Sequence, residues 1–528
     1  MRRHLLLTSL FLGIAFDILF WKKAPGISFA IFIALCLAAG YLLLRLQNLH
    51  PAWRSLLLLV PIIFFSVMTF IRREPFTLFL NYALTLFSTA VFVMTYLGGL
   101  WTLYSLSDYV ANFFHLVGSM LSLPWTQITN TDSQQKTSIG RGNKNNVWPI
   151  VRGSLLAIPV LLVFAALFSS ADLIFEQRLN DLLTNLNLER ITEYILRGIY
   201  ILIIAYFLVG VIKHAESKSQ NEKLIGIDKP IVAPFLGFTE TSIILGSVLL
   251  LFSAFVIIQF QYLFFGQTNI TLTGFTYSEY ARRGFGELVA VAVFSLFLIQ
   301  SLSAVTKRDT NRKKKIFSGL VIGLVILVLI ILVSSFQRLF LYESAYGFSR
   351  LRTYSHVFMI WLGILLVAVV TIEVIKRQRA FTNIALLALM GFTASLNLLN
   401  VDAFIANQNI NLAVHGKELD IFYLSTLTSD AVPTLVKEYS SSNLPSKIQD
   451  GIGAALVCYK ISEETDASQT QFWQSFHFSD WNAASELNKV QESLKSYQVQ
   501  DDAWPIIIIG PNEIEYPCGD YLFSDKGL

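Results

Sequence analysis

The chain has few charged residues and few cysteines for its length. Of its 528 residues only 14% are charged, compared with about 25% in soluble domains, while 54% are hydrophobic. The mean hydropathy is +0.56. This composition excludes an ordinary soluble protein.

Signs of enzyme chemistry are also missing. None of the seven histidines forms a pair at metal-ligand spacing, and the three cysteines include no C-x-x-C. There is no phosphate-binding loop and no G-x-S-x-G turn, and Gly284-Phe-Gly286 lacks the third glycine of a dinucleotide loop. No basic surface is interleaved with aromatic residues, as nucleic-acid binding would require. The sequence therefore predicts no catalytic, cofactor-binding or metal-binding residue, no cofactor and no nucleic-acid partner.

What the chain does have is a series of long apolar runs. A bilayer core of about 30 Å needs about 20 residues of helix, and only helices satisfy the backbone of continuous apolar runs in lipid. The runs do not alternate, which excludes a barrel. We therefore predict an all-α polytopic membrane protein with about eleven transmembrane helices in residues 1–400. The predicted spans are 5–21, 27–44, 55–71, 76–97, 151–171, 194–212, 241–265, 285–305, 316–336, 354–375 and 381–399.

Two features at the membrane boundary qualify this pattern. Residues 5–21 resemble the apolar part of a signal peptide, but Lys22-Lys23 follow in place of a small-residue cleavage site, so we expect an uncleaved first span. Residues 101–123 are less apolar, which favours a helix lying on the membrane surface.

The charges divide sharply at residue 401. Residues 401–528 hold seven lysines, no arginine and eighteen acidic residues, whereas residues 1–400 hold 33 basic and 18 acidic residues. We expect an acidic C-terminal region at 401–528 that binds a protein partner, and a basic membrane body that contacts membrane lipids. Helical periodicity at 448–459 and 487–497, a helix start at Asp430-Ala-Val-Pro433 and a strand-like run at 506–509 predict a small, mainly helical domain.

The basic residues also predict orientation. With the N-terminus inside, the cytoplasmic segments hold twenty-one of them and the opposite connections twelve, as the positive-inside rule requires. Lys22-Lys23 and Arg72-Arg73 are exceptions to this rule. The prediction is a multi-pass protein of the bacterial cytoplasmic (inner) membrane with the C-terminal region outside the cytoplasm. Cys458 and Cys518 would pair only if that region faces an oxidising compartment.

Several separated motifs resemble a family of bacterial polytopic membrane proteins known as domain of unknown function 4173. They are Tyr280-Ala-Arg-Arg-Gly-Phe285 with Glu287-Leu288, Tyr346-Gly-Phe-Ser-Arg-Leu-Arg352, Asn400-Val-Asp-Ala-Phe-Ile-Ala406 and Ser429-Asp-Ala-Val-Pro433. The resemblance implies the architecture of a polytopic membrane protein. It implies no catalytic residue, because that family has no assigned activity.

The same motifs place charged residues at the outer ends of several predicted spans. Charges near the membrane need partners or water, so these residues are expected to gather. One interpretation is an anion or lipid-headgroup site, since arginine forks match phosphate and carboxylate oxygens. The other is a structural ion-pair network between helix ends. The candidate cluster consists of Glu279, Arg282, Arg283, Glu287, Arg338, Glu343, Arg350, Arg352 and Asp402.

Three functional hypotheses remain open. The first, which we favour, is a non-catalytic structural or regulatory component of the cell envelope. The second is a transporter or lipid-handling protein that uses the outer arginine cluster. The third is a membrane-embedded transferase acting on a lipid-linked substrate. Asp17, Glu240 and Glu373 are candidate proton-relay groups, and His356 is either a lone acid–base residue or a hydrogen-bonded residue at a helix end.

Overall fold

The structure of the chain, a computed structural model, describes most of the predicted elements. The described residues are 2–129, 188–220, 233–264, 285–467, 472–500 and 505–519, with isolated positions between 157 and 178 and at 224 and 225. The predicted fifth span, 151–171, lies outside the described ranges.

Ten helices in the described ranges are long and apolar enough to cross a membrane, and they coincide with the other ten predicted spans. The chain is thus an all-α polytopic membrane protein. One of the ten is formed by the short helix α3 together with α4. The helices of the body are α1 (Arg2–Phe20), α2 (Ile27–Arg45), α3 (Trp53–Leu56), α4 (Leu59–Ile71), α5 (Pro75–Met94), α6 (Leu106–Thr129), α9 (Leu188–Ser217), α10 (Phe238–Phe264), α12 (Phe285–Val305), α13 (Asn311–Tyr346), α14 (Arg350–Ile375) and α15 (Phe381–Leu399).

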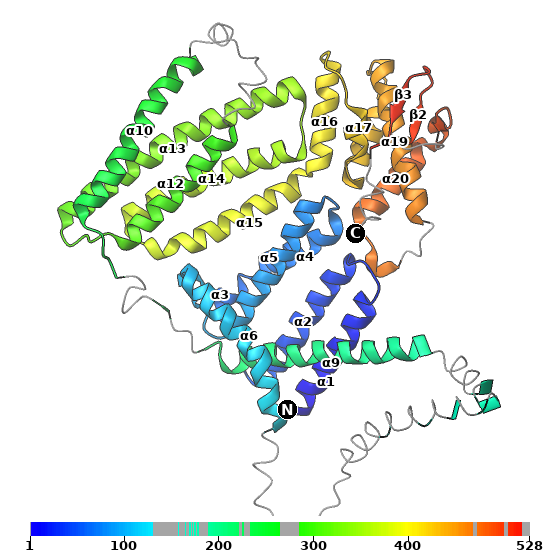
Figure 1. The fold of residues 1–528 in the computed structure, drawn as a ribbon, viewed down its shortest axis with the longest axis horizontal. Helices are drawn as coiled ribbons and strands as arrows, with labels where there is room; N and C mark the ends of the chain where they lie inside the picture. Colours follow the sequence, from blue (N-terminus) through cyan, green and yellow to red (C-terminus); the bar gives the residue numbers. More distant parts are fainter. Residues whose placement is uncertain are drawn as a thin grey trace, which may run out of the picture.

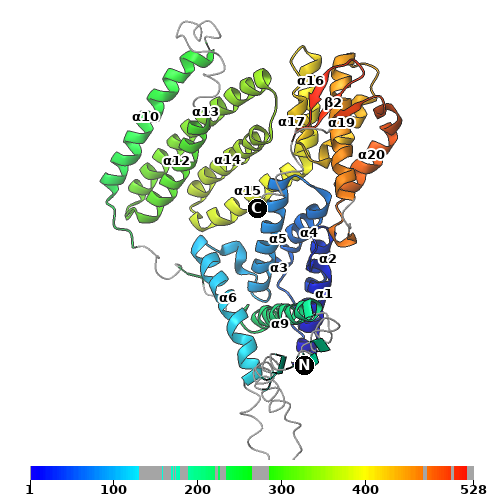
Figure 2. The same ribbon diagram turned by 45° about the vertical axis from the view of Figure 1, so that its right-hand side comes forward.

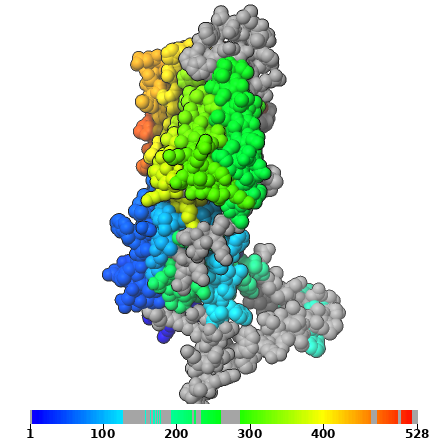
Figure 3. Space-filling view, turned by 90° about the vertical axis from the view of Figure 1, so that its left-hand side faces the viewer, coloured from blue at the N-terminus to red at the C-terminus, as the bar shows by residue number. Residues whose placement is uncertain are grey.

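These helices form two groups, which Figures 1 and 3 show in different parts of the molecule. In the first group α9 packs against α1 and α6, and α4 packs against α2 and α5. In the second group α13 packs against α10, α12 and α14, and α14 also packs against α15. Each group has its own apolar core. The groups meet where α15 contacts α4 and α5, and the side-chain amides of Asn81 and Asn397 exchange two hydrogen bonds there.

Helix α13 shows how the sequence sets the length of an element. Its 36 residues span about 54 Å, well beyond the bilayer core. The helix ends at Gly347, whose φ of +78° favours glycine. Helix α14 then begins at Arg350, so the turn between the two helices lies beyond the apolar run 316–336.

The C-terminal region is mainly helical, as predicted, and its apolar core also includes Phe392 and Leu396 of α15. Its helices and 3₁₀ turns are α16 (Val401–Val414), α17 (Ile421–Ser425), η5 (Ser429–Ala431), α18 (Val432–Tyr439), α19 (Ser446–Ala467), η6 (Trp473–Ser475) and α20 (Phe478–Leu494). The expected helix start at 430–433 corresponds to η5 and α18, and the two helical periodicities correspond to α19 and α20. The expected strand run corresponds to β2 (Ile507–Ile509).

Two short strands on either side of β2 were not predicted from the sequence. They are β1 (Gln498–Gln500) and β3 (Glu515–Pro517), and the sheet order β1-β2-β3 is antiparallel throughout. Val499 pairs with Ile508, which in turn pairs with Tyr516. Cys458 of α19 and Cys518 after β3 form a disulfide with a Cα–Cα distance of 5.7 Å, so the pairing left open by the sequence does occur.

The C-terminal region sits against one face of the membrane body (Figures 1 and 2). We call this the junction face; it carries the α1–α2, α4–α5 and α13–α14 turns and the end of α15. Ser475 bonds to Ala24 in the first turn, and the Asp480 carboxylate lies 3.5 Å from Arg73 in the second. The described N-terminus and the α12–α13 and α14–α15 turns lie at the opposite end of the helices.

Candidate functional site

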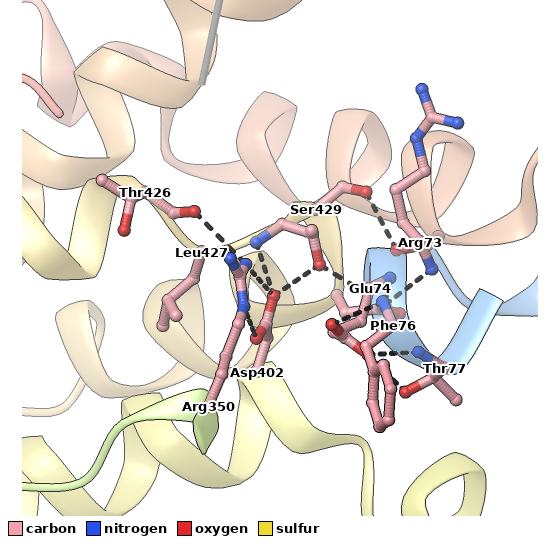
Figure 4. Close-up of polar contacts among 12 residues, drawn as sticks. Arg73, Glu74, Phe76, Thr77, Arg350, Asp402, Thr426, Leu427 and Ser429 are labelled. Atoms are coloured by element: carbon pink, nitrogen blue, oxygen red, sulfur yellow. Dashed lines mark hydrogen bonds and ion pairs between the residues drawn. The ribbon is translucent and has the colours of Figure 1, made fainter. Parts of the chain in front are cut away.

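Asp402 on α16 is the centre of a polar network at the junction face. Its side chain is fully buried. Arg350 at the start of α14 donates to it from both edges of its fork, with Nε 2.8 Å from Oδ1 and Nη2 2.6 Å from Oδ2. The backbone N–H and the hydroxyl of Thr428 each donate to Oδ2 at 2.7 Å. Figure 4 shows Arg350 between Asp402 and the carbonyl of Thr426, to which it also donates.

The turn that presents Arg350 is held by α16 and α17. The side chain of Asn409 accepts a hydrogen bond from Phe348 N at 2.6 Å and donates one to Phe348 O at 3.0 Å. The backbone N–H of Arg350 donates to the Tyr423 hydroxyl. A Cβ on Gly347 would lie 2.9 Å from Asn409 Oδ1, so glycine is needed there for space as well as for its φ. The C-terminal region therefore fixes the position of the α13–α14 turn.

Asp430 in η5 makes an equivalent connection to the α4–α5 turn. Its Oδ2 accepts from the backbone N–H groups of Arg73 and Glu74 at 2.8 and 3.2 Å. The Arg72 guanidinium lies 3.6 Å from Oδ1 and also donates to Asn397 O at the end of α15. Arg73 extends its own guanidinium towards Asp480 of α20.

Glu74 begins helix α5 and is itself buried. Its carboxylate accepts from the backbone N–H groups of Phe76 and Thr77, as an N-cap does, and Pro75 occupies the first turn, where no N–H is needed. Tyr354 of α14 donates its hydroxyl to the same carboxylate. One side chain thus joins the α4–α5 turn to α14.

We call Glu74, Arg72, Arg350, Asp402 and Asp430 the junction network. It contains three buried carboxylates and two guanidinium groups, so the carboxylate charge is incompletely balanced. Burial raises the pKa of Asp430 above its usual range, opposed by the Arg73 backbone N–H and the Arg72 guanidinium. Buried charges are tolerated when they are paired and hydrogen-bonded, as Asp402 and Asp430 are. Glu74 accepts hydrogen bonds from Phe76 N, Thr77 N and the Tyr354 hydroxyl.

The structure brings together only part of the predicted cluster. Arg350 and Asp402 form the ion pair above. Arg352 donates to the carbonyls of Tyr346 and Gly347 and stacks over the Tyr342 ring, so it caps the end of α13. Glu287 is exposed at the start of α12, and Arg338 lies on α13 before Glu343. Glu279, Arg282 and Arg283 lie outside the described residues.

Glu343 and His356 form a second buried pair. His356 Nδ1 on α14 lies 3.1 Å from Glu343 Oε2 on α13, and Phe336 packs edge-on against the His356 ring. Within the described residues, neither oxygen of Glu343 accepts a hydrogen bond of good geometry, and the Thr353 hydroxyl one turn from His356 has no partner either. Of the two interpretations left open by the sequence, the lone acid–base residue does not describe His356, because its ring faces a carboxylate.

The three candidate proton-relay groups, Asp17, Glu240 and Glu373, all accept hydrogen bonds. Asp17 on α1 accepts from Arg197 on α9 through both edges of the fork, with Nε 3.0 Å from Oδ1. Glu373 accepts from Ser318 and lies 3.5 Å from Arg308. Glu240 accepts from Gly237 N and so caps α10.

Three members of the junction network, Arg72, Glu74 and Asp430, were absent from the predicted cluster. The available signal was the run Arg72-Arg73-Glu74-Pro75 between two apolar spans, where charges are rare and usually functional or paired. No periodicity could supply their contacts, which join residues about 280 to 360 positions apart.

No group of three or more His, Cys, Asp or Glu side chains able to hold a metal ion occurs in the part of the chain that the structure describes. A family model described as Domain of unknown function (DUF4153) matches residues 59–438, which include the whole junction network. No curated protein and no solved structure matches the chain.

The matched region extends from α4 to α18 and covers well over half of the chain. The expectation of a family without an assigned activity is confirmed, while the particular family that the motifs indicated, 4173, stays a prediction. This multi-pass integral membrane protein of unknown biochemical activity belongs to the family described as domain of unknown function DUF4153.

Proposed function

We propose that the protein is a non-catalytic structural or regulatory component of the bacterial cell envelope, in which the C-terminal region and the membrane body act as one unit. The observation that carries this proposal is the junction network. Asp402 and Asp430 of the C-terminal region reach the start of α14 and the α4–α5 turn. Arg72 of that turn pairs with Asp430 and extends the network to the end of α15 through Asn397 O. A displacement of the C-terminal region would therefore be transmitted to α5, α14 and α15.

The use of the arginine side chains supports this role over anion binding. The Arg350 fork is directed at Asp402 and Thr426 O, and Arg72 at Asp430 and Asn397 O. Arginines that serve a substrate need donors directed at the substrate. Here the forks join segments of the same chain.

We also propose that the N-terminus is cytoplasmic and the C-terminal region extracytoplasmic, in the bacterial inner membrane. The Cys458–Cys518 disulfide supports this, because disulfides persist in oxidising compartments. The exceptions to the positive-inside rule have a physical explanation, since Arg72, Arg73 and Lys22 on the junction face are paired with carboxylates. By contrast, Arg312, Lys314 and Lys315 at the opposite end are exposed.

Two finer points rest mainly on the sequence. The motifs at 346–352 and 400–406 support a relationship to family 4173 as well, and both of these motifs contribute a side chain to the Arg350–Asp402 pair. The acidic composition of the C-terminal region, whose boundary we place at residue 401, supports a basic protein partner or ligand on the surface away from the body.

The function of the junction can be tested by complementation of a deletion strain under envelope stress, such as detergent or low osmolarity. We expect Arg350→Ala and Asp402→Ala to fail to complement at matched membrane levels. The exchange Arg350→Asp with Asp402→Arg should restore growth in part, because the two side chains act on each other.

An unequal result would overturn the proposal. If Asp402 variants complement while Arg350 variants do not, Arg350 has a ligand other than Asp402. Transport or lipid handling then becomes the better explanation. The matched control is Glu418→Gln, an exposed carboxylate in the same region.

Transport or lipid handling is the second candidate, and the Glu343–His356 pair favours it. A buried carboxylate whose oxygens lack well-formed hydrogen bonds, at the membrane end of two spans, is typical of ion or proton pathways. We expect Glu343→Gln to leave folding intact and to abolish ion flux into vesicles if this reading is right. An unchanged flux would leave the pair with a structural role.

A further inference from the structure

Residues 472–481 carry large aromatic side chains on the outside and polar side chains on the inside. We call Phe472, Trp473, Phe476, Phe478 and Trp481 the aromatic rim; all are exposed, with Trp473 at 59% and Trp481 at 57%. Between them, Gln474, His477 and Ser479 are buried to 5% exposure or less. A domain surrounded by water shows the opposite pattern, and a contiguous exposed apolar patch marks a binding surface.

The inward polar groups explain why this segment holds its conformation. Gln474 donates to Ile18 O at 3.3 Å, and His477 Nδ1 lies 3.0 Å from Ser475 O. The Ser479 hydroxyl lies 3.0 Å from that of Ser429 in η5. Because these side chains are used inside the structure, the aromatic side chains are left facing outward.

The segment is tied to the ends of two membrane spans. Ser475 Oγ donates to Ala24 O at 2.7 Å, and Ile27 N donates to Phe476 O at 3.0 Å. The two views in Figures 1 and 2 show this orange segment, just before α20, at the tip of the blue α1–α2 pair. Since α1 and α2 both cross the membrane, the turn that joins them marks its surface.

A basic group accompanies the rim. The Lys23 ammonium lies 5.3 Å from the centre of the Phe472 ring and donates to Ile18 O. Lys22 precedes it in the α1–α2 turn and pairs with Glu193. Lysines at the end of a span reach towards lipid phosphates, and tryptophan is enriched at the same depth because its ring is apolar and its N–H polar.

We propose that the aromatic rim is a phospholipid-binding surface that inserts into the headgroup layer beside α1 and α2. It anchors the C-terminal region to the leaflet on its own side of the membrane, in addition to the junction network. The occupant is lipid because the rim is continuous with two spans at the membrane surface, which no soluble partner could approach without displacing lipid. This inference does not depend on the role proposed above.

Site-directed spin labelling of the full chain tests the rim. Trp473→Cys and Trp481→Cys are labelled separately in a Cys36→Ser background, without reductant so that Cys458 and Cys518 stay paired. The control is Glu492→Cys, whose side chain is 86% exposed on α20. The protein is reconstituted in vesicles of phosphatidylethanolamine and phosphatidylglycerol, and accessibility to oxygen and to a water-soluble nickel chelate is measured.

We expect labels at 473 and 481 to lose nickel accessibility and gain oxygen accessibility relative to position 492. Equal nickel accessibility at all three positions would mean that the rim faces water. Exclusion of both reagents at 473 and 481 would mean that protein, a second copy or a partner, covers the rim. Either result overturns the proposal.

A second measurement avoids the introduced cysteines. The emission difference between the wild type and Trp473→Phe/Trp481→Phe isolates these two of the nine tryptophans. It should be quenched by lipids brominated near the headgroup and not by aqueous iodide. Quenching by iodide would contradict the lipid-facing assignment.

Discussion

At the scale of single residues, the junction depends on buried carboxylates whose partners come from distant parts of the chain. Asp402 has no exposed surface, and its carboxylate accepts hydrogen bonds from Arg350 and Thr428. Such a pair contributes little net stability compared with apolar residues of the same shape, but removal of one member leaves the other buried and uncompensated.

Asp402→Asn is therefore expected to destabilise the folded protein by about 3–5 kcal/mol. Thermal unfolding of the purified protein in detergent measures the change. Glu418→Gln should shift the midpoint by little, since surface substitutions stay within about 0.5 kcal/mol. An equal effect of the two variants would contradict a buried pair.

His477 gives the junction face a pH dependence with a definite sign. Burial and the nearby Arg73 lower its pKa, while Asp480 and the Ser475 carbonyl oppose this. The folded protein therefore keeps His477 neutral, whereas the unfolded chain takes up a proton below a pH of about 6.5. The free energy of unfolding is therefore highest above this pH and decreases as the pH is lowered towards the depressed pKa of His477 in the folded state.

We predict that this stability falls by up to about 1.4 kcal/mol for each pH unit below about 6.5. His477→Gln should reduce the slope of the unfolding midpoint against pH between 5 and 8. His415→Gln, at an exposed position, should leave it unchanged. If both variants keep the wild-type slope, other groups carry the dependence.

At the scale of elements, the α1–α2 turn fits the C-terminal region through a close backbone approach. A Cβ on Gly26 would lie 2.6 Å from Phe476 O and 2.7 Å from the Ser475 carbonyl carbon. Both are backbone atoms, so neither can move aside as a flexible side chain would. Gly40, in the middle of α2, has open space around its Cβ position.

Gly26→Ala should separate the turn from η6 and lower the free energy of unfolding by about 1–3 kcal/mol, as overpacking does. Gly40→Ala should be neutral or stabilise by up to about 1 kcal/mol, because alanine favours helix. Unfolding midpoints of the two variants, with protease digestion to detect release of the C-terminal region, measure the difference. Similar midpoints for both would show that the turn can open without cost.

The disulfide joins α19 to the end of the sheet across 60 residues. Closing a loop of that length lowers the entropy of the unfolded chain and thereby raises its free energy by about 4 kcal/mol at 25 °C. Cys458→Ser/Cys518→Ser should therefore unfold at a lower temperature than the oxidised wild type and resemble the reduced wild type. An unchanged midpoint would mean that the sheet and helix α19 hold together without the bond.

At the scale of the whole molecule, the two faces of the body differ in how their basic residues are used. On the junction face Arg72 and Arg350 pair with carboxylates. On the opposite face Arg308 and Arg379 are also paired, but the turn before α13 presents exposed Arg312, Lys314 and Lys315 in addition. This asymmetry supports an N-terminus inside the cytoplasm.

Thiol labelling of spheroplasts tests the orientation. After reduction by a membrane-impermeant reagent, Cys458 and Cys518 should react with an impermeant maleimide. In a chain with all three native cysteines replaced by serine, Lys314→Cys should react only after the cells are opened. The reverse pattern would place the C-terminal region in the cytoplasm.

Several elements were predictable because they are determined by residues close together in the sequence. The ten described spans follow from the length of apolar runs, and the start of α18 from Pro433 in its first turn. Strands β1 and β3 were not predictable, because Gln498–Gln500 and Glu515–Pro517 are short and mostly polar. They form strands because each of them pairs with one edge of β2.

The candidate site was less predictable than the spans. The sequence placed Arg350 and Asp402 together, since both lie at the same ends of spans. It did not pair Asp430 with the α4–α5 turn or Asp17 with Arg197, although each partner was visible as a charge near an apolar run. The folded chain pairs Asp17 with Arg197 and Glu373 with Arg308, which lie on other helices or turns.

The sequence by itself determined the membrane class, the positions of the spans and the acidic C-terminal region, because apolar length and net charge act segment by segment. Only the tertiary structure decided which carboxylate meets which arginine and which side of residues 472–481 faces outward. Those outcomes depend on contacts between residues as many as about 450 positions apart. No local pattern in the sequence indicates which distant residue a polar side chain will bond.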